Sequence, residues 1–118
     1  MDRAITPDEA AVVRWLLDHA PRGDVTAFRL QPVEQLRVVG GCGCGCSSLD
    51  FQPNGDGAII IADAFAVYSD GKQAGLILWG RQGGVVSLEV YERHPEAADR
   101  FPQVPDLRTF EGPGQELL

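Results

Sequence analysis

The stretch that decides the fold is residues 58–93, AIIIADAFAVYSDGKQAGLILWGRQGGVVSLEVYER. Its isoleucine, valine and aromatic residues favour strands, and they fall into three runs separated by short glycine-containing turns. The turns, Ser69-Asp70-Gly71-Lys72 and Gln82-Gly83-Gly84, are too short to hold a helical crossover. The stretch therefore predicts three consecutive antiparallel strands, over residues 58–69, 75–81 and 85–93.

Two further strand patterns precede this stretch, over residues 33–39 and 47–52. The sequence Pro53-Asn54-Gly55-Asp56-Gly57 follows the second of them and predicts a hairpin turn. Short connections of this kind join antiparallel neighbours. We therefore expect an antiparallel β-meander of four to five strands.

A helix is predicted before the strands. Thr6 is a suitable N-cap, Pro7 suits the first helical position, and Glu9 completes a capping box with Thr6. Residues 10–20 then keep an apolar face until Pro21 ends the pattern. The fold class is therefore α+β, with one N-terminal helix packed on the meander.

The C-terminal part of the chain has a different period. Large apolar residues recur every third position among prolines, at Phe101, Val104, Leu107 and Phe110. This period is typical of an extended polyproline II path. Such a segment either covers an edge of the sheet or offers a proline-rich peptide to a partner. We assign residues 1–111 to a single α+β domain and residues 112–118 to a flexible C-terminal tail.

Charge limits the classes of partner. The 118 residues carry a formal net charge of −7, which argues against binding to nucleic acid or to an anionic membrane. The first residues lack the basic and apolar regions of a signal peptide, and no apolar run approaches the ~18 residues of a spanning helix. We therefore expect a cytoplasmic protein.

The most unusual composition lies in residues 40–51, Gly-Gly-Cys-Gly-Cys-Gly-Cys-Ser-Ser-Leu-Asp-Phe, which hold all three cysteines. If this segment is one extended strand with Leu49 and Phe51 toward the core, alternation places the cysteines on the opposite face. A single bulge near Ser47 would bury the thiols instead.

Metal binding is one reading of Cys42, Cys44 and Cys46. With His94 or His19 these thiols would make a Cys3His zinc site, and soft thiolates also suit monovalent copper. Extended residues i and i+2 lie about 6.6 Å apart, whereas sulfurs that share one zinc lie within about 4 Å, so the glycines would have to fold the segment into a loop.

The same cysteines have other readings. A Cys–His catalytic pair with His94 would need only proximity in space, although no Cys-x-x-Cys redox motif occurs. In the third reading the cysteines are small packed hydrophobes. We therefore assign no catalytic residue and no resident cofactor, and we keep the three thiols as candidate metal ligands.

Side chains of the central strands add two candidates. Asp63 interrupts an apolar strand, and a buried aspartate there would need a cation such as Arg81 or Lys72. Trp79 and Tyr68 stand on adjoining strands, where they either stack with a ligand on the open side of the sheet or pack across the strands.

The order of elements resembles a group of small uncharacterised bacterial proteins. In that group a threonine-capped helix precedes a strand, a glycine-rich segment ending in Ser-Leu-x-Phe, and a β-meander; the matching residues are 6–17 and 40–51, with the strands through Tyr91. The chain is also similar to immunity-type proteins of bacterial toxin systems in its size, acidity and architecture. No functional residue is carried over from either group.

Two functions follow from these observations. The first is a non-enzymatic, immunity-like domain that binds another protein, and the acidic charge favours a basic partner. The alternative is a thiol-dependent metal-binding or redox protein that uses Cys42, Cys44 and Cys46. The sequence sets neither the oligomeric state nor the identity of a partner.

Overall fold

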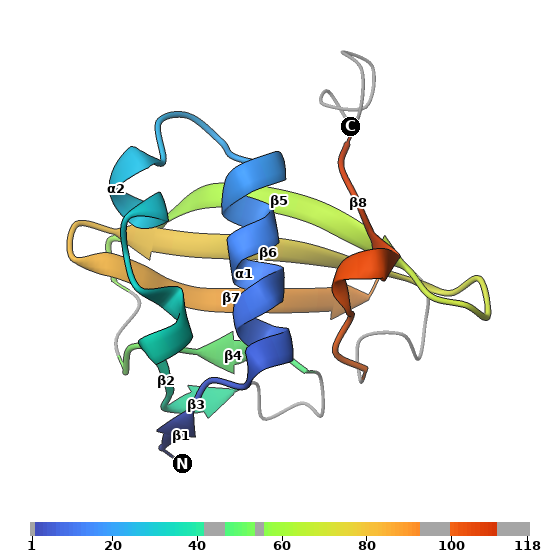
Figure 1. Cartoon of the computed structure of the whole chain (residues 1–118), viewed down its shortest axis with the longest axis horizontal. Helices are drawn as coiled ribbons and strands as arrows, with labels where there is room; N and C mark the ends of the chain where they lie inside the picture. The colour runs from blue at the N-terminus through green and yellow to red at the C-terminus, as the bar shows by residue number, and fades with distance from the viewer. Residues whose placement is uncertain (1, 42–46, 54–55, 93–99, 111–118) are drawn as a thin grey trace.

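The structure is a computed structural model that describes residues 2–41, 47–53, 56–92 and 100–110. Figure 1 shows two layers, an antiparallel sheet and a layer of helices on one of its faces. In chain order the elements are β1 (Arg3–Ala4), α1 (Pro7–His19), α2 (Thr26–Arg29), η1 (Val33–Gln35), β2 (Arg37–Val38), β3 (Gly40–Gly41), β4 (Leu49–Asp50), β5 (Ile59–Val67), β6 (Gln73–Arg81), β7 (Gly84–Glu92), η2 (Val104–Asp106) and β8 (Leu107–Arg108).

The main sheet confirms the predicted α+β class. Within the described residues it has six antiparallel strands in the order β3-β4-β7-β6-β5-β8, slightly more than the four to five expected. The three long strands β5, β6 and β7 follow one another as predicted, and each has nine residues. No helix in the described part of the chain is long and apolar enough to cross a membrane.

The predicted hairpin at residues 53–57 is wrong. β4 pairs with β7 and not with β5, so two strands separate the elements that this turn connects. A turn signal fixes where a chain bends, whereas strand pairing depends on which side chains can be buried together. Here Leu49 stands opposite Leu88 of β7, and both residues are buried.

The strand predicted over residues 33–39 is also wrong. The segment begins as the 3₁₀-helix η1, and only Arg37–Val38 form a strand, which pairs with β1. Its fully buried residues, Val33 and Val38, are five positions apart. Residues an odd number apart point to opposite faces of a regular strand, so an extended segment could not have buried both in one core.

The register of the central strands gives the sheet two distinct faces. The helix face, which lies against α1, carries Ala62, Ala64 and Ala66 of β5 opposite Leu78, Leu76 and Ala74 of β6, with Leu88 and Val90 of β7 beyond them. All of these residues are buried. The short side chains of β5 allow α1 to pack closely on the sheet, where it crosses the strands (Figure 1).

Helix α1 begins as predicted. The Thr6 hydroxyl accepts from the Glu9 backbone N–H, and a Glu9 carboxylate oxygen accepts from the Thr6 N–H, 2.9 Å away. The Arg3 guanidinium donates to both Glu9 oxygens over 2.8 and 2.9 Å. This donation, aided by the Thr6 N–H, holds the pKa of Glu9 below its usual range. The capping box therefore also ties β1 to the helix.

The C-terminal segment covers the outer edge of β5, as one of the two readings predicted. Leu107 and Arg108 pair with Ala66 and Phe65 as strand β8, and Leu107 is buried. The path is not wholly extended, because η2 inserts one 3₁₀ turn at Val104–Asp106. Residues 112–118, assigned to a tail, lie outside the described residues.

Candidate functional site

The three cysteines lie outside the described residues, but the segments on both sides of them are described. Gly40 and Gly41 pair antiparallel with Asp50 and Leu49, so the chain reverses between Gly41 and Leu49. Residues 40–51 are therefore not one extended strand, which was the condition for placing the cysteines by alternation. Leu49 and Phe51 do point toward the core, as that condition also required, and both are buried there.

Cys42, Cys44 and Cys46 stand between two paired strands, and the zinc or copper site remains a prediction. His94 is also outside the described residues, whereas His19 ends α1 and stacks on Trp15 with ring centroids 4.9 Å apart. Among the residues that the structure describes, no group of three or more His, Cys, Asp or Glu side chains could hold a metal ion.

Asp63 forms an ion pair, but its partner differs from the two predicted. Arg22 donates through Nε and Nη2 to the two carboxylate oxygens of Asp63 over 2.8 and 2.7 Å. Arg81 instead donates to the backbone oxygen of Asp56. Arg22 reaches Asp63 because the chain after α1 runs along β5, where the Arg22 N–H donates to the Ile61 carbonyl and the Ala20 carbonyl accepts from Asp63.

Tyr68 and Trp79 do not share a face of the sheet. Tyr68 is buried in the core, donates its hydroxyl to the Arg100 carbonyl over 2.6 Å, and has the Arg100 guanidinium 4.5 Å from its ring centroid. Trp79 pairs with Ile60 and Ser87 on the opposite face. Tyr68 therefore packs within the protein, which was the second of the two predictions. Of the two aromatic residues, only Trp79 stands on the side of the sheet where a ligand could stack.

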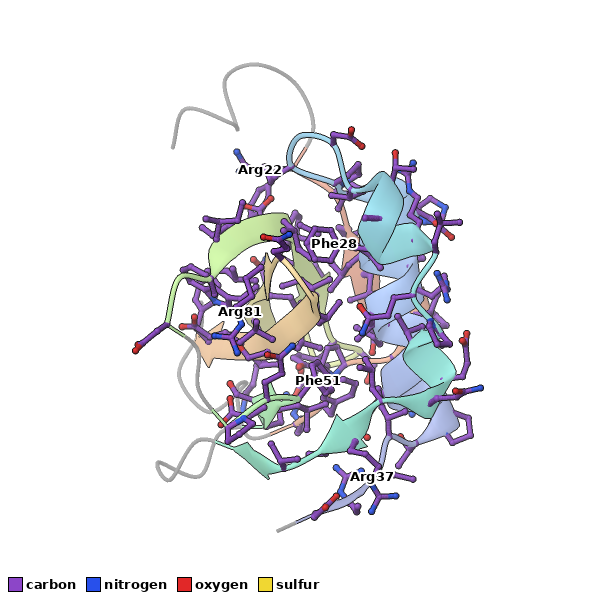
Figure 2. All side chains as sticks on the ribbon, turned by 90° about the vertical axis from the view of Figure 1, so that its left-hand side faces the viewer. Arg22, Phe28, Arg37, Phe51 and Arg81 are labelled. Carbon is purple, nitrogen blue, oxygen red and sulfur yellow. The ribbon has the colours of Figure 1, made fainter. Side chains whose placement is uncertain are left out.

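The face turned away from α1, called the open face below, is largely apolar. The described helices all lie on the other side of the sheet (Figures 1 and 2). Apolar and aromatic side chains from the three long strands dominate the open face: Ile60, Phe65, Val67, Ile77, Trp79 and Tyr91. An antiparallel sheet with one solvated face normally alternates apolar and polar residues, so this face departs from the common pattern.

Several of these side chains are half-buried or exposed. Ile60 is 40% exposed, and Ile77 and Trp79 are half-buried. Tyr91 lies flat over Gly75, where an added Cβ would stand 1.9 Å from the tyrosine ring. The glycine thus lets an aromatic ring lie on the sheet.

Carboxylates border this apolar surface. Asp50 stands opposite Ser87, and Glu89 stands opposite Ile77, whose other neighbour is Asp63. The Trp79 indole N–H donates to a Glu89 carboxylate oxygen over 3.1 Å, which fixes the orientation of both side chains. The open face therefore combines apolar and aromatic side chains with carboxylates that stand beside them, of which Asp63 is paired with Arg22.

The described arginines all have at least one hydrogen-bond acceptor within the chain. Each described arginine donates to a carboxylate, a side-chain amide or a backbone carbonyl: Arg3, Arg14, Arg22, Arg29, Arg37, Arg81, Arg100 and Arg108. Asp50 and Glu89, by contrast, have no ion pair within the described part of the chain. These two carboxylates therefore contribute uncompensated negative charge to the open face.

Comparisons with family models, curated proteins and solved structures find no match to this chain.

Sequence reasoning found part of this surface. It placed Trp79 and Asp63 on the central strands, but it did not select Phe65, Ile77 or Asp50. The consecutive apolar residues Ile77, Leu78 and Trp79 could have indicated it, since a strand that is apolar at every position has two apolar faces.

Proposed function

We propose that this chain is a protein-binding domain and that it binds a basic partner on its open face. The observation that carries the proposal is the set of large apolar side chains, centred on Ile77 and Trp79, on the face opposite α1. A contiguous apolar patch with a polar border is typical of a protein interface, because burial of that patch drives association.

Charge supports the choice of a basic partner. Asp50 and Glu89 stand beside the apolar side chains of the open face, and each described arginine has an acceptor within the chain. Basic side chains of a partner would pair with these carboxylates as the apolar centre becomes buried, and the net charge of −7 would accelerate the encounter. A cytoplasmic, immunity-like neutraliser of a basic protein is the form of this function that we favour.

Photo-crosslinking from two positions tests the choice of face. A photoreactive phenylalanine analogue replaces Ile77 on the open face in one variant and Ala11, which is exposed on α1, in the other. We expect a basic protein to crosslink from position 77 and not from position 11. Crosslinking from position 11 alone would place the interface on the helix layer and contradict the proposal.

The captured protein is then purified and titrated to establish that the contact is specific. We expect Glu89→Lys to weaken binding at least about tenfold, because it replaces an attraction with a repulsion. Asp8→Lys makes the same charge change at an exposed position of α1 and serves as the matched control. Equal losses for the two variants would show only a long-range charge effect and would contradict binding at the open face.

A further inference from the structure

A second concave surface lies at the end of the molecule where β6 turns into β7. This groove has a volume of about 500 Å³, within the range of ligand sites. Ala27, Phe28 and Gln31, from α2 and the residues after it, line one side, and residues 81–84 of the hairpin line the other. It is distinct from the apolar side chains of the open face, and a ligand bound there would be independent of the proposed function.

The floor of the groove is apolar. Figure 2, which looks onto this end of the molecule, shows Phe28 between α2 and the strands. Its ring lies over Gly80, where an added Cβ would stand 2.8 Å from the ring. Two exposed large apolar residues adjoin these elements, although neither lines the groove: Leu30 directly follows α2 and is 81% exposed, and Ile59 of β5, opposite Gly80, is 64% exposed.

Gln31 presents hydrogen-bond donors at the rim. Its side-chain oxygen accepts from the Val85 backbone N–H over 3.0 Å, and a backbone donor there fixes which end of the amide is the oxygen. The amide nitrogen consequently lies over Gly84, where an added Cβ would stand 2.8 Å from it. No acceptor for this nitrogen occurs within the described residues.

Arg81 is the one charged side chain among the described residues that line the groove. Its Nη1 donates to the Asp56 carbonyl over 2.8 Å and its Nη2 donates to the Gln52 side-chain oxygen. A guanidinium carries five N–H donors, so these two bonds hold it in place and leave further donors. An apolar floor with a fixed cation and an amide donor at its rim is complementary to an apolar group that carries a carboxylate.

We propose that the groove binds the free C-terminus of a peptide whose last residue is apolar. The terminal side chain would lie on Phe28, and the terminal carboxylate would accept from Arg81 and the Gln31 amide. The groove is open to solvent, which suits an extended peptide better than an enclosed small molecule.

Peptide titrations followed by NMR test this proposal. The probe is acetyl-alanyl-leucyl-phenylalanine with a free carboxylate, and the control probe is the same peptide with a C-terminal amide. We expect a Kd on the order of 1 mM for the free acid, shifts at the amides of Gly83, Gly84 and Val85, and binding about tenfold weaker for the amide. Equal affinity for the two peptides would overturn the carboxylate assignment.

A matched pair of variants locates the site. Ala27→Glu adds a carboxylate at an exposed position of the groove, and we expect it to weaken binding of the free acid about tenfold or more. Ala11→Glu makes the same change on α1 and should leave the affinity unchanged. Unchanged binding by Ala27→Glu would place the peptide elsewhere. Binding of 3-phenylpropionate as tight as that of the peptide would overturn the choice of a peptide ligand.

Discussion

The two faces of the sheet differ in what covers them more than in what they contain. On β6, Leu76 and Leu78 point to the helix face and are fully buried, whereas Ile77 and Trp79 point to the open face and are half-buried. Both pairs are large and apolar. The difference teaches that an apolar strand face is core only where another layer lies on it, and it is the reason why we propose the open face as the binding surface.

The largest expected difference between the faces is in stability. Leu78→Ala should lower the free energy of unfolding by about 2 to 5 kcal/mol, because it leaves a cavity in the packed core. Ile77→Ala, one residue away on the open face, should cost about 1 kcal/mol or less, because solvent can fill the space. Urea unfolding of both variants measures these costs. Equal costs would show that the open face is packed as a core.

A smaller effect is expected where the open face itself is packed. Gly75→Ala should cost about 1 to 3 kcal/mol, because its Cβ would overlap the ring of Tyr91, which must then shift. In a Tyr91→Ala background the same change should be nearly neutral, since the ring is gone. The free energies of unfolding in this double-mutant cycle give the coupling, and an equal cost in both backgrounds would contradict the ring packing.

Some of this arrangement could be predicted from the sequence, because it depends on local patterns. The capping box of Thr6 and Glu9 and the three long strands rest on short-range signals, and the structure has them where they were expected. The three-residue period before Phe110 left two readings open, and the structure has the one in which the segment lies at a sheet edge.

Other features depend on pairing between distant segments and could not be predicted in this way. No local pattern places β4 beside β7, selects Arg22 as the partner of Asp63, or puts Tyr68 on the helix face. The two faces were also indistinguishable by hydrophobicity alone, since residues 76–79 are apolar at every position. The position of α1, set by tertiary packing, decides which of them is core.

The helix layer should respond to pH through Glu9. Its pKa is lowered in the folded state because Arg3 donates to the carboxylate, so ionised Glu9 stabilises the fold at neutral pH. That contribution is complete above the ordinary pKa of about 4.3 and is lost as the pH falls through the lower folded value.

Glu9→Gln should therefore cost about 1 kcal/mol at pH 7 and progressively less below about pH 4. Urea unfolding of both proteins at several pH values measures the difference, with Glu34→Gln as the control, because Glu34 is exposed. A difference between the Glu9 variant and the native protein that is independent of pH would contradict the ion pair with Arg3.

The smallest effect is expected where the chain after α1 runs along β5. Arg22→Ala should cost about 1 kcal/mol or less, because Arg22 is 48% exposed and water screens its pair with Asp63. Thermal unfolding in low and high salt measures this cost. A decrease of several kcal/mol in the free energy of unfolding would mean that residues 20–22 are held against β5 mainly by the ion pair and not by their backbone hydrogen bonds.

Ile77→Lys, measured for both stability and binding, tests the central claim most directly. The new ammonium would stand between Asp63 and Glu89, where the fold tolerates it, and it would repel a basic partner. We predict cooperative unfolding within about 1 kcal/mol of the native protein and binding of the crosslinked partner weakened at least about a hundredfold, whereas Leu78→Lys should not fold. Unchanged binding by folded Ile77→Lys, or its failure to fold, would contradict the account.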